Sequence, residues 1–190
     1  MDINCSFSRV EEVSKDLIGI VLAPYKPDCQ YLKQAFFYYP AQESPGGDLG
    51  FIKGDFAIPE SCYIDDTGHF NSVEFNICYN QIFYVLIAYL VQQQLLPEMK
   101  DWDLERYKHR QLSDFLITRF SSTFRRPVNS AAFQGMLSIN RCAARRGLIT
   151  VKTSCAFYDE AGWSEGDVTV CVVNQSAARS VKDANLSLSS

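Results

Sequence analysis

The loop from Tyr63 to Asn71 carries the strongest local signal for chemistry in this sequence. It contains the run Asp65-Asp66-Thr67-Gly68-His69 and leads into a long apolar segment that begins near Ser72. A loop that ends at a helix start has free backbone N–H groups and the positive end of the helix dipole beside it. Both suit the binding of a thioester carbonyl and of its oxyanion. The apolar segment behind the loop can line a groove for an acyl chain.

Asn71 has a structural and a catalytic interpretation. With Glu74 three residues later it forms a capping-box pattern, in which the asparagine accepts from free N–H groups and the glutamate reaches back. The spacing favours the cap and leaves a catalytic role open. His69 is similarly open, since a histidine in such a loop is more often a packing residue than a substrate contact.

Asn80 lies on one side of the predicted helix together with Ile77 and Tyr84. A buried amide among apolar neighbours must find hydrogen bonds or cost about 1–3 kcal/mol. Asn76, one turn earlier, is a candidate partner. A structural amide and a ligand-facing amide fit this pattern equally well.

A tyrosine and a group of arginines complete the candidates. Tyr25 lies between Pro24 and Pro27 in a stiff loop, where a packing role is favoured over a catalytic one. Arg119, Arg125 and Arg126 form a basic patch. Such a patch is usually a solvated strand end, but it can also hold the phosphates of a cofactor or an acidic carrier.

The composition excludes several classes of protein. The 190 residues, 47% hydrophobic and 21% charged, predict one globular domain over 1–175, with 176–190 as a poorly ordered tail. The net charge of −4 argues against nucleic acid as a partner. The longest apolar run, Ile82 to Val91, is shorter than the roughly 20 residues that cross a bilayer.

Cysteine and histidine usage points to free thiols and no metal site. The 7 cysteines form no CxxC pair, and there are only 2 histidines. An odd number of cysteines without such spacing predicts neither a disulfide framework nor a zinc site. With no signal peptide visible at the N-terminus, the expected location is the reducing cytoplasm.

The order of predicted elements indicates an α+β fold. Hydrophobic spacing predicts a helix over Ser8–Leu22, strands over Gln30–Tyr39 and Leu49–Ile58 joined as a hairpin around a turn at 44–48, and a helix over about Ser72–Leu95. A short helix within Pro97–Arg110 and strands over Gln111–Phe124, Ala131–Arg145, Leu148–Tyr158 and Asp167–Val173 follow. The second half of the long helix is apolar all round, so a sheet must wrap it. That is the hot-dog arrangement, with an ordinary α+β sandwich as its rival.

Several motifs resemble one known family. They are Pro24-Tyr25, Ser61-Cys62-Tyr63-Ile64, Thr67-Gly68-His69-Phe70-Asn71, Val73-Glu74, Asn80-Gln81, Gln111-Leu112-Ser113 and Phe124-Arg125-Arg126-Pro127. Together they resemble the FcoT-like thioesterases, hot-dog enzymes that hydrolyse fatty acyl thioesters. The resemblance spans roughly Leu22 to Phe133.

The resemblance implies active-site residues at Tyr25, Tyr63, Asn71 and Asn80, with Thr67, Gly68, His69, Arg125 and Arg126 in contact with substrate. It implies hydrolysis of acyl-CoA or acyl carrier protein (ACP) thioesters without a cofactor. The alternative activity within the family adds glycine to an α,β-unsaturated acyl thioester and then releases the acid. A non-catalytic acyl-CoA-binding module is the third possibility. Because a single hot-dog unit leaves a sheet edge open, we expect a homodimer or larger homo-oligomer.

Overall fold

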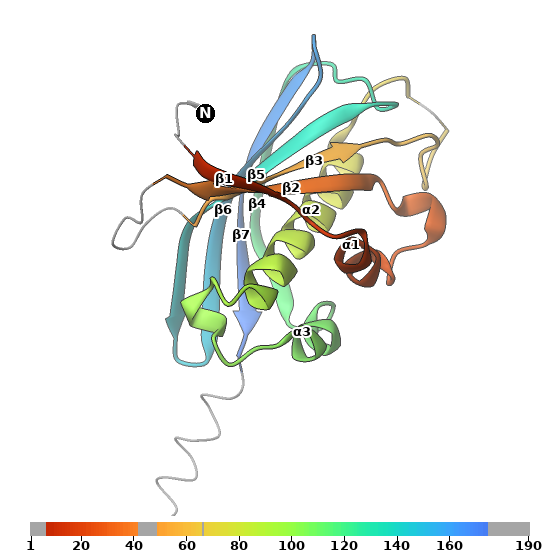
Figure 1. Cartoon of the computed structure of the whole chain (residues 1–190). Coiled ribbons are helices and arrows are strands. Elements are labelled where there is room, and N and C mark those ends of the chain that lie inside the picture. The colour runs from red at the N-terminus through yellow and green to blue at the C-terminus, as the bar shows by residue number, and fades with distance from the viewer. Residues whose placement is uncertain (1–6, 42–48, 66, 175–190) are drawn as a thin grey trace, which may run out of the picture.

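The structure is a computed structural model that describes residues 7–41, 49–65 and 67–174 (Figure 1). Both the turn expected at 44–48 and the tail expected at 176–190 lie outside the described residues, the first in the gap before residue 49. The elements are, in order, β1 (Phe7–Glu12), α1 (Lys15–Leu22), the 3-10 turn η1 (Pro27–Cys29), β2 (Leu32–Pro40), β3 (Phe51–Phe56), α2 (Ser72–Gln92), the 3-10 turn η2 (Pro97–Met99), α3 (Leu104–Arg110), β4 (Phe115–Arg126), β5 (Phe133–Arg145), β6 (Leu148–Tyr158) and β7 (Trp163–Val173).

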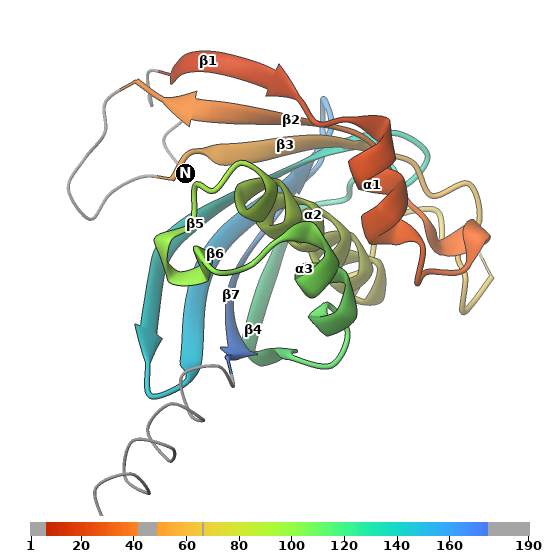
Figure 2. The same cartoon turned by 60° about the horizontal axis from the view of Figure 1, so that its bottom comes forward.

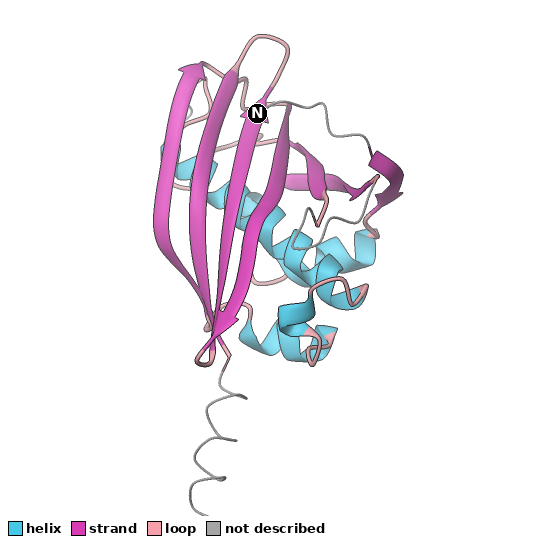
Figure 3. Ribbon diagram, turned by 90° about the vertical axis from the view of Figure 1, so that its left-hand side faces the viewer, coloured by secondary structure: helices cyan, strands magenta, loops and turns pink. Residues whose placement is uncertain are grey.

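All seven strands form one antiparallel sheet in the order β1-β2-β3-β5-β6-β7-β4. The chain crosses from β3 through α2 and returns as β4 at the far edge, beside β7. The sheet curves around α2, and α1 and α3 lie against the same helix (Figures 2 and 3). A curved antiparallel sheet around one long helix is the hot-dog fold, so the predicted α+β hot-dog class is confirmed.

Helix α2 forms the centre of the core. Most of its side chains from Phe75 to Val91 are buried, as the apolar second half predicts. The inner face of β6 packs against it, and the period-two set from Ile149 to Phe157 is buried throughout. No helix among the described residues is both long and apolar enough to span a membrane.

The helix predicted over Ser8–Leu22 is wrong in its first half. Residues Phe7–Glu12 form β1, which pairs with β2 through Val10 and Tyr38, and the helix begins only at Lys15. Its cap is Ser14, whose hydroxyl accepts from the backbone N–H of Leu17 at 3.2 Å. The pairing with β2 decides the conformation of the segment before the cap, and spacing within one segment does not reveal such pairing.

The other expected elements are present, with shifted ends. β2 and β3 form the predicted hairpin, and the last third of the chain forms four strands. β7 begins at Trp163 rather than Asp167, and β4 begins at Phe115 rather than Gln111.

Candidate active site

Phe70 anchors the loop before α2 in the core. Its ring is 1% exposed and lies 4.8 Å from the ring of Phe133 and 5.3 Å from that of Phe157, centroid to centroid. Its backbone N–H donates to the carbonyl of Val128 at 3.0 Å. The two residues beside Phe70, His69 and Asn71, are therefore held on a fixed piece of backbone at the start of α2.

Thr67, Gly68 and His69 form a closed turn before this anchor. The Thr67 hydroxyl donates to the His69 carbonyl at 2.9 Å, and Nδ1 of His69 lies 3.0 Å from the Thr67 carbonyl. Gly68 has a φ of +73°, a conformation that favours glycine. Thr67 and Gly68 thus orient His69 within this turn.

Asn71 caps α2, as the capping-box spacing predicts. Its Oδ1 accepts from the backbone N–H of Val73 at 3.0 Å and of Glu74 at 3.2 Å, and the Glu74 carboxylate accepts from the backbone N–H of Asn71 at 3.1 Å. Glu74 is 3% exposed and is engaged in this cap. The two backbone donors fix which end of the amide is oxygen, because only oxygen can accept from them.

Tyr63 completes the hydrogen bonds around that oxygen. Its hydroxyl donates to Asn71 Oδ1 at 2.8 Å, so the oxygen receives three donors. The amide nitrogen, Nδ2, is buried and has no hydrogen-bond partner among the described residues. An unsatisfied buried donor costs about 1–3 kcal/mol and calls for an explanation in a native protein. A substrate oxygen is the kind of acceptor this group lacks.

A pocket of about 390 Å³ lies where the Asn71 loop meets the end of β4. It is lined by His69, Phe70, Asn71, Ser72, Phe124, Arg125, Arg126 and Pro127. Four of the predicted site residues, His69, Asn71, Arg125 and Arg126, therefore share one pocket. Two residues beyond the lining residue Pro127, the backbone N–H of Asn129 donates to the Asp159 carboxylate at 2.6 Å.

The two neighbouring arginines of the pocket differ in their partners. Arg125 pairs with Glu165 at 2.9 Å on the outer face of the sheet, and Arg126 forms no salt bridge among the described residues. The pKa of Glu165 is lowered by hydrogen bonds from Trp163 and from Arg125. Arg126 is close enough to help lower the pKa of Asp159, after the backbone bonds that the carboxylate accepts. A phosphate-binding role for the pair stays a prediction. Of the two, Arg126 is the arginine whose charge is not paired in a salt bridge among the described residues.

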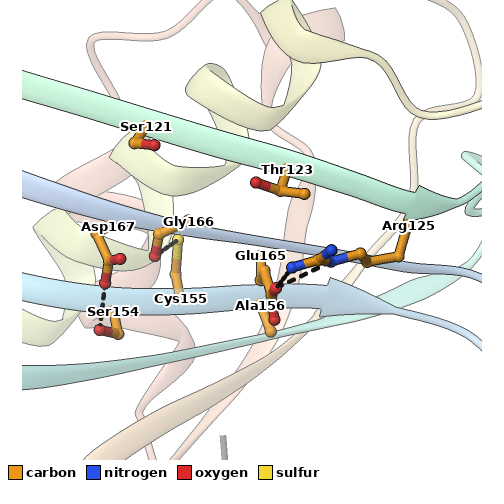
Figure 4. Close-up of a pocket in the computed structure, with 9 residues that line it drawn as sticks. All are labelled: Ser121, Thr123, Arg125, Ser154, Cys155, Ala156, Glu165, Gly166 and Asp167. Atoms are coloured by element: carbon orange, nitrogen blue, oxygen red, sulfur yellow. Dashed lines mark hydrogen bonds and ion pairs between the residues drawn. The ribbon is translucent and has the colours of Figure 1, made fainter.

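Arg125 also borders a second hollow, on the outer face of the sheet (Figure 4). This polar hollow has a volume of about 420 Å³, and helix α2 lies behind it, on the opposite face of the sheet. Two of its charged groups are already engaged, since Glu165 binds Arg125 and Asp167 accepts from the Ser154 hydroxyl at 2.6 Å. Arg125 lines both this hollow and the Asn71 pocket.

Asn80 and Tyr25 lie outside the Asn71 pocket, Asn80 on α2 and Tyr25 near Tyr84 and Cys78 of the same helix. Nδ2 of Asn80 donates to Oδ1 of Asn76 at 2.9 Å, which is the structural partner that the spacing suggested. Tyr25 is partly buried, and burial raises the pKa of its phenol, with Tyr84 and Cys78 nearby. Asn80 lies about 13 Å along the helix axis from the Asn71 cap. Within one chain the structure joins Tyr63 to Asn71 and places Tyr25 beside Tyr84, one helical turn from Asn80.

The described cysteines are free thiols. Burial, followed by a hydrogen bond with Cys62, raises the pKa of Cys29 to about 11, and burial raises the pKa of Cys78 well above its ordinary value. Both thiols are therefore protonated near neutral pH and are poor nucleophiles. Among the described residues there is no cluster of His, Cys, Asp and Glu suited to a metal ion.

Comparison with known proteins gives the family. Residues 20–172 match the FcoT-like thioesterase domain. This chain belongs to that family. The FcoT-like match covers the capped helix, the pocket loop and strand β4, whose end borders the pocket, so the resemblance seen in the motifs is confirmed.

Two relatives extend over most of this FcoT-like chain. A Streptomyces coeruleorubidus protein named (2E)-enoyl-ACP glycyltransferase is 44% identical over 164 residues, which cover 83% of this chain and 96% of the relative. A Mycobacterium marinum protein of the same name is 35% identical over 167 residues, covering 85% and 88%. Among solved structures, a Staphylococcus aureus protein in complex with CoA matches with a TM-score of 0.44 and 12% identity, over 71% of this chain and 75% of that one.

Sequence reasoning missed the residues that build the pocket walls of this FcoT-like domain. Phe124 and Pro127 line the pocket, and Phe70 holds the loop in place. Their signal was present, because all three lie inside the quoted motifs. The motifs do not reveal the backbone hydrogen bond from Phe70 to Val128, because it joins two segments that are far apart in the sequence.

Proposed function

We propose that this protein adds glycine to the β-carbon of an α,β-unsaturated acyl thioester carried by ACP, and then hydrolyses the thioester to release the acid. The observation that supports this most is the 44% identity to the Streptomyces (2E)-enoyl-ACP glycyltransferase over 96% of its length. Simple hydrolysis of saturated acyl thioesters, the first expectation from the motifs, becomes the second candidate. The family description, a thioesterase domain, favours that candidate.

One group serves both steps of the proposed reaction. The Nδ2 of Asn71 would donate to the thioester oxygen, because its Oδ1 already accepts from three donors and Nδ2 has no acceptor among the described residues. A hydrogen bond to that oxygen withdraws electrons from the conjugated β-carbon, which favours amine addition. It also stabilises the oxyanion that forms when water attacks the carbonyl. Tyr63 is a positioning residue in this scheme, because its hydroxyl donates its hydrogen bond to Asn71 Oδ1 and not to the substrate.

The remaining residues take supporting parts. Neither step requires an electron carrier or a metal, because the addition and the hydrolysis move only protons and electron pairs. Tyr25 and Asn80 would contact the acyl chain or thioester from further along α2. The free thiols of the described cysteines fit a reducing cytoplasm, where we place the protein.

We infer that the working form is a homodimer. Among the described residues, β4 is an edge strand of the sheet with no strand beyond it, and Leu116 and Ile117 on it are 50% and 38% exposed. Helix α2 also has a partly exposed stripe, which includes Val73, 43% exposed, and the half-buried Asn80. An open edge next to apolar side chains is a surface that proteins usually cover.

A dimer would also explain the separation of the site residues. Asn71 and Asn80 of one chain are too far apart along α2 to bind one carbonyl. Asn80 and Tyr25 of a partner could approach the Asn71 pocket across the open stripe. Light scattering at micromolar concentration should give twice the chain mass, and Ile117→Glu should shift it to one chain mass. A wild-type monomer contradicts the dimer.

Mass spectrometry of the products tests the activity. The protein is incubated with a (2E)-enoyl-ACP and with the matching saturated acyl-ACP, each with and without glycine. The proposed function predicts an acid heavier by one glycine, formed only from the enoyl substrate and only when glycine is present. Hydrolysis of both substrates without any adduct identifies a simple thioesterase. Unchanged thioester in every reaction identifies a binding module.

A further inference from the structure

We propose that His69 is the base that takes the proton from the attacking amine, and that Arg126 holds the carboxylate of that amino acid. This inference rests on the proposed glycine addition and deepens it. An amino acid enters such a reaction as a zwitterion, and its ammonium group has no lone pair with which to attack. The protein must therefore remove a proton from nitrogen while keeping the carboxylate bound.

The turn around Gly68 fixes the form of the His69 ring. Nδ1 lies 3.0 Å from the carbonyl oxygen of Thr67, which can only accept a hydrogen bond. In the neutral ring Nδ1 therefore carries the hydrogen, and Nε2 carries the lone pair. Nε2 has no partner within the part of the chain that the structure describes. An imidazole with one nitrogen bonded to a carbonyl and the other open is arranged to accept a proton.

The place of His69 is equally specific. It lines the same pocket as Asn71, two residues later, whose amide nitrogen would hold the thioester oxygen. Phe70 between them is buried, so the spacing of the two side chains is set by a rigid segment. His69 itself is exposed and can be reached by a small soluble amino acid.

Arg126 is the cation available for the carboxylate. Of the two arginines in the pocket, Arg125 is bound to Glu165, and Arg126 is in no salt bridge among the residues described. A guanidinium binds a carboxylate through two parallel hydrogen bonds, which also orients it. With the carboxylate at Arg126 and the ammonium at His69, the amino acid would span the pocket toward the β-carbon.

The proposed step balances without any further reactant. His69 Nε2 removes one proton from the ammonium, and the freed lone pair forms a bond to the β-carbon. The C=C electrons move toward the thioester oxygen, where Asn71 Nδ2 stabilises the enolate. The imidazolium then returns its proton to the α-carbon. The product is the β-amino acyl thioester, with the new nitrogen protonated and His69 neutral again.

The test compares two nucleophiles on His69→Gln. Glycine needs deprotonation, whereas aminooxyacetate has a similar carboxylate and a weakly basic amino group that is already neutral near pH 7. For glycine the rate of adduct formation should fall by about 10²–10⁴, the usual contribution of a general base. For aminooxyacetate it should change by less than about fivefold. Raising the pH should partly restore the variant with glycine, because more of the free amine is then present. His109→Gln, on exposed α3, is the matched control.

Arg126→Gln should raise the KM for glycine and for aminooxyacetate alike, with the KM for the acyl thioester unchanged. Arg145→Gln, an exposed strand-end arginine, is its control. An increase confined to the thioester KM would assign Arg126 to the carrier phosphate instead and would overturn the carboxylate role. Equal losses with both nucleophiles in His69→Gln, or no loss, would overturn the base role. A wild-type protein that forms no adduct with either nucleophile refutes the proposed function itself.

Discussion

Replacing Asn71 should separate its structural role from its catalytic role, because the two ends of its side chain make different contacts. The oxygen caps α2 and accepts from Tyr63, and the nitrogen is unpartnered among the described residues. Asn71→Ser keeps a hydroxyl oxygen for the cap and removes the amide nitrogen. Asn71→Ala removes both. Serine and asparagine are about equally good at the N-cap position.

The two variants should differ in stability and agree in activity. Loss of the cap in Asn71→Ala costs about 1 kcal/mol, and loss of the exposed bond to Tyr63 adds about 0.5 kcal/mol. For a chain of 190 residues this corresponds to a fall in Tm of roughly 3–6 °C. Asn71→Ser should stay within about 2 °C of the wild type, since it retains the cap. Both variants should lose about 10²–10³ in kcat, the usual loss for one oxyanion donor.

Thermal unfolding and steady-state turnover on an enoyl thioester measure the two effects. The matched control is Asp103→Ser, because Asp103 caps α3 by accepting from the backbone N–H of Arg106 at 2.7 Å, away from the pocket. It should leave kcat unchanged. If Asn71→Ser folds normally and turns over at the wild-type rate, the amide is only a helix cap and the proposed oxyanion donor is wrong.

Three further outcomes follow from the same contacts. Tyr63→Phe should lower kcat about three- to tenfold, the value of one neutral hydrogen bond, and barely change Tm since Tyr63 is 48% exposed; a Tm loss without a rate loss contradicts this. Asn80→Ala should lower kcat by about 10²–10³ while Asn76→Ala, which removes the same hydrogen bond, should not; equal rates in both variants make Asn80 a structural amide. Asp159→Asn should lower the free energy of unfolding in urea at pH 7. Because backbone hydrogen bonds lower the pKa of Asp159, the stabilisation from its charged carboxylate is complete above the ordinary aspartate pKa of about 4 and is lost on acidification. A stability difference between wild type and Asp159→Asn that grows toward pH 3 would contradict this role.

Local sequence determined the elements whose signals lie within a few residues. The cap at Asn71 and Glu74 follows from a three-residue spacing, and the structure contains both of its hydrogen bonds. The burial of the second half of α2 follows from the apolar run Ile82 to Val91, which has no polar face. The period-two pattern of β6 predicts its inner face correctly. In each case the structure follows from residues close together along the chain or from a regular spacing of apolar residues within one segment.

Tertiary structure alone decided which residues share a site and which partners they have. The segment from Phe7 became a strand because β2 offered it a free edge, although its spacing resembled a helix. Arg125 and Arg126 are neighbours that the sequence pattern does not distinguish. Only Arg125 forms a salt bridge with Glu165, 40 residues away, so among the described residues the charge of Arg126 is left without a salt-bridge partner. The nitrogen of Asn71 is left unpartnered among the described residues because Tyr63 and the helix start take its oxygen. Hydrogen bonds and ion pairs depend on distances of a few ångströms between distant segments, and no local pattern encodes those distances.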